Sequence, residues 1–148
     1  MAHLLFLLHV GSTLYMVGLI WFIQVVHYPL HNHIGADEFS TYQQFHMSWT
    51  TWVVGPPMLI EMATTILFVL APPLDLPSWY FWIGAVFLLI VWGSTALFQV
   101  PYHNSLLDNF DTDAHKKLVS SNWIRTIFWS LRGGLVLYVT FLLLKQVP

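Results

Sequence analysis

The chain has 148 residues, of which 57% are hydrophobic and only 8% are charged, and its mean hydropathy is +0.65. A soluble domain carries about 25% charged residues, so this composition cannot cover a water-facing surface and predicts a protein of the lipid bilayer. The formal net charge of −2 excludes the basic footprint of a nucleic-acid binder, and the absence of cysteine excludes disulfides, thiolate catalysis and iron–sulfur clusters.

Four segments are long and apolar enough to cross a membrane, at residues 4–26, 49–71, 79–100 and 123–144. At 1.5 Å per residue each is about 33 Å long, against about 30 Å of hydrocarbon. Three of them open on a tryptophan, which favours the membrane interface. We therefore expect one all-α domain over residues 1–148, a four-helix transmembrane bundle with both termini on one side. The short, proline-rich connection at 72–78 joins two antiparallel helices.

The end of the first span carries polar side chains. Gln24 is expected to point into the bundle, and His27 and His31 are four residues apart, which places them on one helix face. This is a common spacing of metal ligands, although Pro29 between them can kink or end the helix. His33 is expected to lie further from the membrane than His27 and His31, exposed to water and outside any site.

The second span has two features of interest. His46 precedes it, at the same end of the bundle as His27 and His31, and its helix is expected to start with Asp37 or Ser40 as the cap. Glu61 falls near the middle of the span, where an ionised carboxylate is costly and a functional role is the default hypothesis. Either Glu61 is neutral, or it pairs with a cation, for which Arg132 is the strongest candidate.

The third and fourth spans complete the polar set. His103 follows the third span at the level of the other histidines, whereas His115 is expected further out. Asp111 or Thr112 can cap the last helix. On that helix Asn122, Arg125 and Arg132 follow spacings of three and seven residues, so they share one face, which must point inward because an arginine facing lipid is penalised.

The two halves of the chain look like a duplication of one helical hairpin. The motif Pro-x-His-Asn occurs at residues 29–32 and again at 101–104, an offset of 72. A repeat of two spans has its pseudo-twofold axis along the membrane normal, which would bring His31 and His103 to the same depth. Chance similarity between two amphipathic hairpins is the alternative.

The stretch Val100–Leu106, followed by Asn122–Thr126, resembles the anthrone-oxygenase-like family of small four-helix membrane proteins. That family carries Val-Pro-x-Asn-x-x-Leu after its third span, then a Trp and an Arg-Thr pair; here His103 stands at the usual Asn. The resemblance implies a four-helix membrane fold and a link to oxidation of hydrophobic aromatic compounds. The stretch His27–His33 also resembles bacterial membrane proteins that carry no known activity, which implies a bacterial inner membrane.

The first functional hypothesis is a membrane oxidoreductase or oxygenase with a histidine metal site near one membrane face. Imidazole suits iron, copper or zinc, bound as one ion or two, and haem b between two histidines is an alternative cofactor. The substrate would be a lipophilic small molecule in an apolar pocket. The expected metal ligands are His27, His31, His46 and His103.

The expected supporting residues have two roles. Glu61, Arg125 and Arg132 are assigned to catalysis, and Gln24 and Asn122 to holding the cofactor or substrate. Two other functions stay open from the sequence. One is a proton-coupled or small-ligand binding or transport module built on Glu61 and Arg132, for which four spans would need a homo-oligomer. The other is a structural subunit of a larger membrane complex.

Overall fold

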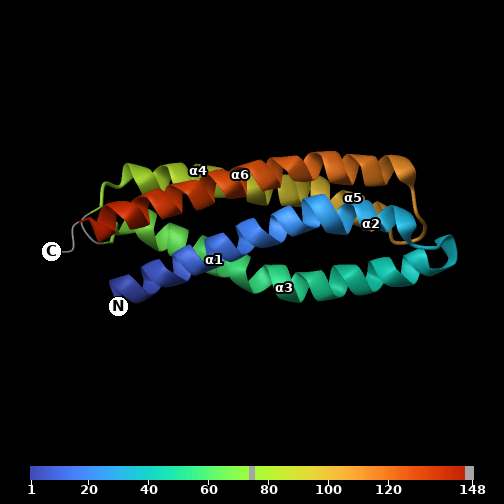
Figure 1. Cartoon of the computed structure of the whole chain (residues 1–148), viewed down its shortest axis with the longest axis horizontal. Coiled ribbons are helices and arrows are strands. Elements are labelled where there is room, and N and C mark those ends of the chain that lie inside the picture. Colours follow the sequence, from blue (N-terminus) through green and yellow to red (C-terminus); the bar gives the residue numbers. More distant parts are fainter. Residues whose placement is uncertain (74–75, 146–148) are drawn as a thin grey trace.

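The computed structural model describes residues 1–73 and 76–145, and over this part of the chain it is a bundle of four helical rods with no strand (Figure 1). The two termini lie at the same end of the bundle (Figure 1). Each rod is long and apolar enough to cross a membrane, so the predicted all-α transmembrane fold is confirmed. Leu74 and Asp75, within the predicted connection at 72–78, lie outside the described residues.

The first rod changes its helical type toward the histidine end. Helix α1 (Ala2–Phe22) continues into a π-helical turn η1 (Ile23–His27), the short helix α2 (Tyr28–Leu30) and a 3₁₀ turn η2 (His31–His33). Pro29 lacks an N–H and its ring clashes with the carbonyl four residues earlier in an α-helix. The wider π turn lies directly before it, where it relieves this clash.

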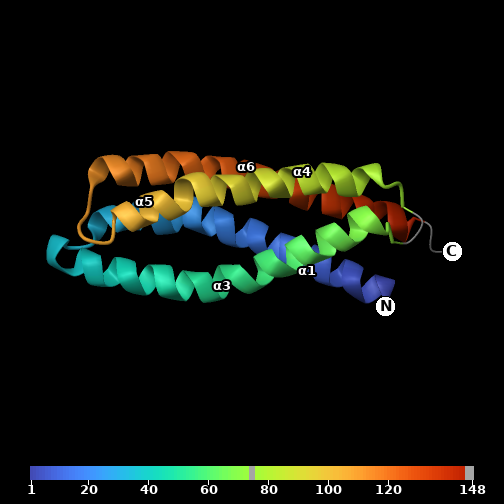
Figure 2. The same cartoon turned by 180° about the vertical axis from the view of Figure 1, so that it is seen from behind.

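Helix α3 (Ala36–Leu70) starts earlier than the predicted second span. Its N-cap is Gly35, which has no side chain to cap with, so the prediction of Asp37 or Ser40 as the cap was wrong. Ser40 Oγ instead donates to the carbonyl of Leu107 at 2.7 Å and ties the first connection to the third. Two adjacent prolines, Pro56 and Pro57, lie inside α3, where the helix bends (Figure 2).

The second half of the chain follows the same plan as the first. Helix α4 (Trp79–Ser94) continues into a π-helical turn η3 (Thr95–Gln99) and then α5 (Val100–Ser105), with Pro101 in the position that Pro29 has in the first rod. Helix α6 (Thr112–Leu144) follows, and its N-cap is Asp111 as predicted. The Asp111 Oδ1 atom accepts from the backbone N–H groups of residues 113 and 114, both at 2.8 Å.

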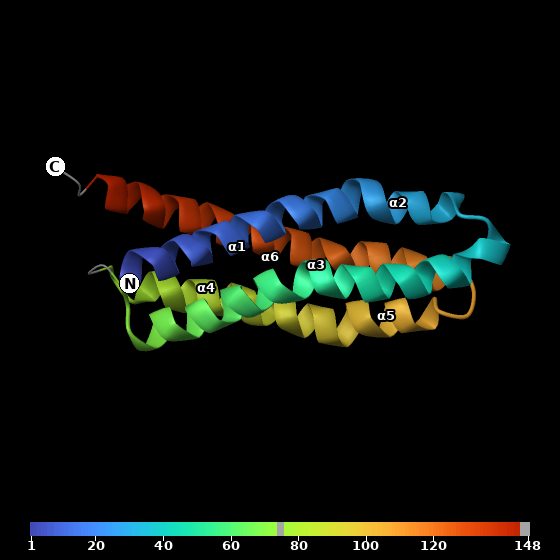
Figure 3. The ribbon, with the colours of Figure 1, turned by 90° about the horizontal axis from the view of Figure 1, so that it is seen from below.

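The four rods run side by side along the long axis of the bundle (Figure 3). They contain 27 to 34 residues, which makes them about 40–50 Å long, so they overshoot the hydrocarbon of about 30 Å. Trp21, Trp49 and Trp123 are exposed on three different rods, and they mark one membrane interface. The π turns and the histidine-bearing connections lie at and beyond this level.

Candidate metal centre

Three histidines from two rods converge at the end of the bundle that holds connections one and three. His27 closes the π turn η1, His31 opens η2, and His46 lies on α3 about ten residues after that helix begins. Each offers one ring nitrogen, and these nitrogens all lie within 4.8 Å of one another. His31 is 1% exposed, and His27 and His46 are half-buried. The predicted convergence of these three ligands is therefore present in the structure.

The nitrogens of this histidine triad lie close to one another and to two hydroxyl groups, of which Thr50 Oγ1 lies 3.2 Å from His46 Nδ1. His27 Nε2 lies 3.0 Å from His46 Nδ1 and 3.4 Å from His31 Nε2. The hydroxyl of Tyr42 is a third neighbour of the same nitrogen, at 3.4 Å. A ring nitrogen of a neutral imidazole carries either one hydrogen or one lone pair, so it can serve one of these neighbours. Lone pairs that converge in this way are the natural ligands of a cation.

Two of the three nitrogen separations in the triad fit a small metal ion, and the third is no longer than 4.8 Å. Bonds of about 2.0–2.1 Å to a tetrahedral ion hold neighbouring nitrogens about 3.3 Å apart, close to the observed 3.0 and 3.4 Å. Three protein ligands and one open position form the usual arrangement of a catalytic zinc site, and imidazole also suits iron and copper. His31 Nδ1 is buried and has no hydrogen-bond partner among the described residues.

His103, the predicted fourth ligand, lies beside the triad but has both ring nitrogens engaged. Its ring is centred 5.2 Å from that of His46. Gln43 donates to its Nδ1 at 3.1 Å, so Nε2 carries the hydrogen and points at the Tyr28 hydroxyl, 3.2 Å away. Tyr28 in turn donates to Gln99 Oε1 at 3.1 Å. The structure therefore brings His103 next to the site without freeing it for a metal.

His115 lies closer to the site than the sequence indicated. It is buried, its ring is centred 5.5 Å from that of His31, and its Nε2 is 3.0 Å from the carbonyl oxygen of Tyr28. His115 therefore helps to hold Tyr28 in place. The sequence did not lead us to predict Tyr28, Tyr42 or Gln43 as residues of the site. His33 is exposed, as expected.

A cavity of about 380 Å³ adjoins the triad. His46 and His103 line one part of it, and the rest is mostly apolar side chains of α3 and the α4 rod. Leu59 and Val100 also line it and are about half exposed, so its mouth opens on the lipid-facing side. Its size and its mixture of apolar walls with a few polar groups are those of a small-molecule site.

The predicted inward-facing amides form a hydrogen-bonded row next to this cavity. Asn122 Nδ2 donates to Gln24 Oε1 at 2.8 Å, and Arg125 donates to Asn122 Oδ1 at 3.3 Å. Gln24 also donates to the carbonyl of Val119 at 3.3 Å. All three side chains of the row are buried, so the expectation that they point into the bundle is confirmed. Among them, Arg125 lines the cavity.

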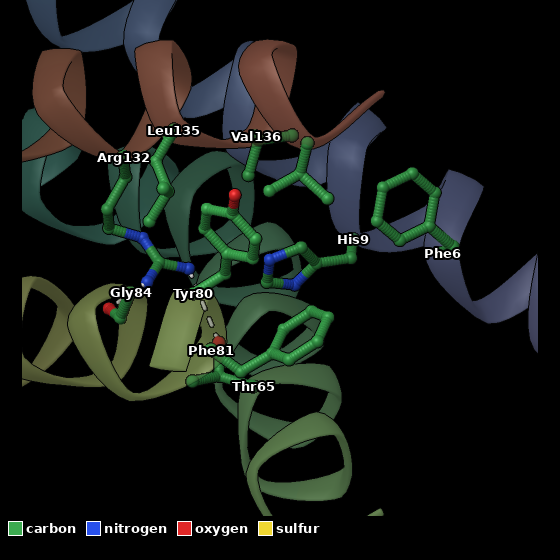
Figure 4. A pocket seen from close by; sticks show the side chains of 10 residues that line it. Phe6, His9, Thr65, Tyr80, Phe81, Gly84, Arg132, Leu135 and Val136 are labelled. Carbon is green, nitrogen blue, oxygen red and sulfur yellow. Dashed lines mark hydrogen bonds between the residues drawn. The ribbon is translucent and has the colours of Figure 1, made fainter. Parts of the chain in front are cut away.

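Glu61 and Arg132 pair with each other, deep in the bundle and away from the histidines. Arg132 Nε lies 3.3 Å from Glu61 Oε1, and Trp129 donates to Glu61 Oε2 at 2.9 Å. Arg132 also donates to the Gly84 carbonyl and, at 3.3 Å, to Thr65 (Figure 4). Glu61 is fifteen residues beyond His46 on α3, which is about 22 Å along the helix. The predicted ion pair is present, and the structure does not bring it to the triad.

The space beside Arg132 is small. It measures about 20 Å³ and lies between Arg132, Tyr80, Phe81 and the ring of His9 (Figure 4). That is room for about one water molecule, so a substrate cannot enter it. His9 itself points to Thr64, with its Nδ1 2.8 Å from the hydroxyl oxygen.

Comparison of the chain with protein-family models, with curated proteins and with solved structures found no match. The resemblance to the anthrone-oxygenase-like family therefore stays a prediction.

Proposed function

We propose that this chain is an integral membrane oxidoreductase of the oxygenase type. A transition-metal ion held by His27, His31 and His46 would act on a lipophilic small molecule in the adjoining cavity. Imidazoles can hold iron, copper or zinc, but only iron or copper would supply the one-electron chemistry that oxygenases use, so protein that holds zinc alone would contradict the oxidoreductase. A bacterial inner membrane is part of the same proposal, and a second ion stays a prediction.

The convergence of the three imidazoles carries this proposal. Their nitrogens approach within 3.0 and 3.4 Å, and all three lie within 4.8 Å of one another, which is the arrangement of side chains that can hold one ion. The triad is held by two rods and enclosed by Tyr42, whose ring centre is 5.5 Å from that of His31. Side chains fixed by packing in this way are what a metal site needs to keep its geometry.

The arrangement favours a single ion over haem. Axial ligands of haem lie on opposite faces of the iron, so their nitrogens must be about 4 Å apart, which is twice a metal–nitrogen bond of about 2 Å. His27 Nε2 and His46 Nδ1 are 3.0 Å apart, and the rings of His31 and Tyr42 stand close by. A macrocycle has no space between them.

The cavity links the metal to a substrate because His46 belongs to both. A ligand in the cavity would lie against the open side of the metal. Arg125 lines the same cavity, and Gln24 and Asn122 fix the position of Arg125. We propose that this row orients the substrate, as predicted. A catalytic role of Glu61 and Arg132 stays a prediction.

Metal content tests the proposal. Protein purified in detergent without chelator is expected to hold about one iron or copper ion per chain by inductively coupled plasma mass spectrometry. His31→Ala removes the buried member of the triad and is expected to lower metal content at least about tenfold, the loss that removal of even a supporting residue can cause. Acidification is expected to release the ion, because protons compete for the imidazole lone pairs.

The matched control is His33→Ala, two residues further along and exposed. It removes a histidine from the same turn without touching the triad, so metal content is expected to stay at the wild-type level. Wild-type protein that is folded and free of metal after growth and purification with each of the three ions would overturn the proposal. Equal loss of metal in both variants would also contradict it.

A binding or transport module is the second candidate, because the cavity has a lipid-facing mouth and could hold a ligand without changing it. Turnover separates the two functions. The oxidoreductase consumes oxygen when metal and a lipophilic substrate are both present, whereas a binding module returns the ligand unchanged.

A further inference from the structure

Arg125 is a buried cation without a counter-ion among the described residues. It is 6% exposed, and the ion pair found in this part of the chain joins Arg132 to Glu61 and leaves Arg125 out. It donates to Asn122 Oδ1 at 3.3 Å, its guanidinium carbon lies 5.1 Å from the centre of the Trp129 ring, and the Tyr28 hydroxyl is a further polar neighbour; none of these groups is a carboxylate. A charge buried in a membrane protein without a partner is costly.

Two side chains that line the cavity carry hydrogen-bond donors without a partner. Arg125 Nε and Trp92 Nε1 are both buried, and neither has a partner within the residues that the structure describes. Arg125 comes from α6 and Trp92 from α4, and both side chains line the 380 Å³ cavity. These two nitrogens have almost no accessible surface, so a ligand in the cavity meets other atoms of both side chains. Guanidinium can donate but cannot accept, so a polar group of a ligand beside Arg125 would be an acceptor.

We infer that the cavity binds a lipophilic molecule with one anionic oxygen group, a carboxylate or a phenolate, and that Arg125 neutralises it. The inference rests on the proposed function for the identity of the substrate site, and it names the chemical class that the site takes. Three neutral imidazoles around a divalent ion would add positive charge close by, which increases the need for an anion. The apolar walls of Val54, Met58 and Leu59 take the rest of the molecule.

Binding of matched acid and neutral probes tests this inference. Decanoic acid is compared with methyl decanoate, and 2,4,6-trichlorophenol with its methyl ether, all at pH 8 and with the protein in phosphatidylcholine nanodiscs. Quenching of tryptophan fluorescence reports binding after subtraction of empty nanodiscs and correction for the partition of each probe. At least one acid is expected to bind about tenfold more tightly than its neutral partner. The pair that shows the preference tells whether carboxylate or phenolate is taken.

Arg125→Gln is expected to remove this preference for the anion, and Arg125→Lys to keep part of it. The control is Lys117→Gln, which removes a cation from an exposed position of the same helix and is expected to change nothing. Equal affinity for acids and neutral partners in the wild type would overturn the inference, as would an unchanged preference in Arg125→Gln.

Gly55→Leu keeps the test decisive if Arg125→Gln does not fold. Gly55 lines the cavity, and a Cβ added there meets no atom within 4 Å, so a leucine side chain starts in open space and takes up cavity volume. It is expected to block all four probes. Unchanged binding of the acids in Gly55→Leu would place them elsewhere and contradict the inference.

The metal-free variant His31→Ala separates this inference from the proposed function. Arg125 is intact in that variant, so the preference for the anion is expected to persist. Wild-type protein that prefers the anion but holds no metal would contradict the oxidoreductase and leave the anion site in place. Protein that holds metal but does not prefer the anion would contradict the anion site and leave the oxidoreductase in place.

Discussion

Two arginines of α6 lie seven residues apart in opposite electrostatic surroundings. Arg132 pairs with Glu61 and donates one hydrogen bond from each of its three guanidinium nitrogens, whereas Arg125 donates to Asn122 and lies against an aromatic ring and the Tyr28 hydroxyl, with no carboxylate beside it in the part of the chain that the structure describes. A paired buried charge contributes to the register of the helices, and an unpaired one is available to a ligand. The same residue type therefore has a structural role at one position and a binding role at the other.

Glu61→Gln tests the structural role. The change leaves Arg132 buried without a counter-charge, which is expected to destabilise the protein by about 3–5 kcal/mol and to lower the midpoint of thermal unfolding in detergent. The double variant Glu61→Leu with Arg132→Met removes both charges and is expected to recover much of that loss. Metal content per folded chain is expected to stay unchanged. A single variant as stable as the wild type would contradict this role.

Residue type and spacing predicted part of the site. The inward amides, the three converging histidines and the Glu61–Arg132 pair follow from the high cost of a polar group in lipid. Tyr42 could have been predicted from the sequence, because it lies four residues before His46 on the same helix face. Gln43 is the next residue along the same helix. The engagement of His103 by Gln43 and Tyr28 could not be predicted, since it depends on side-chain contacts between different rods.

At the scale of the elements, the π turns decide which side chains face the site. Each π turn inserts one residue relative to an α-helix, so it shifts the helical phase of the residues that follow it in the sequence by about 100°. The turn η1 precedes His31 and ends in His27, and η3 precedes His103. Periodicity of 3.6 residues cannot reveal such a change of phase. The two turns are 72 residues apart, the offset of the Pro-x-His-Asn motif, and the duplication of a helical hairpin stays a prediction.

Deletion of one residue from each π turn tests this role. Val25 and Leu97 are equivalent positions, both exposed, so neither deletion removes a core side chain. Deletion of Val25 removes the extra residue, so it is expected to restore an α-helix, to leave His31 facing His46, and to keep the metal. Deletion of Leu97 is expected to leave His103 in place for the same reason. Helix content by circular dichroism is the control for folding, and loss of metal from a folded protein after deletion of Val25 would contradict this account of the turn.

At the scale of the whole molecule, the rods are longer than the membrane is thick. Four apolar spans were predicted from the sequence, because a chain in lipid must satisfy its backbone hydrogen bonds internally and therefore crosses the membrane as helices or as a closed barrel. The predicted spans are shorter than the rods, since α3 and α6 begin in polar sequence well before their apolar part. Hydropathy marks the part of a helix that lies in hydrocarbon, and it carries no information on where the helix itself begins.

Single cysteines test the four-span topology, and the natural absence of cysteine gives a clean background. Asp37→Cys lies at the histidine end and Ser78→Cys at the end with the termini, and both positions are exposed. The two are expected to react with a membrane-impermeant maleimide from opposite sides, one in intact cells and the other in inverted vesicles. Mass-shift gels measure the labelling. Reaction of both from one side would contradict the topology.

The mouth of the cavity at Leu59 and Val100 has a consequence for how the protein meets its ligand. A molecule that enters from the acyl chains is delivered by diffusion within the sheet of lipid, and the water phase serves only as a reservoir. Occupancy then depends on the mole fraction of the ligand among lipids. At a fixed amount of ligand, adding vesicles without protein would dilute it and empty the protein, although the aqueous volume had not changed.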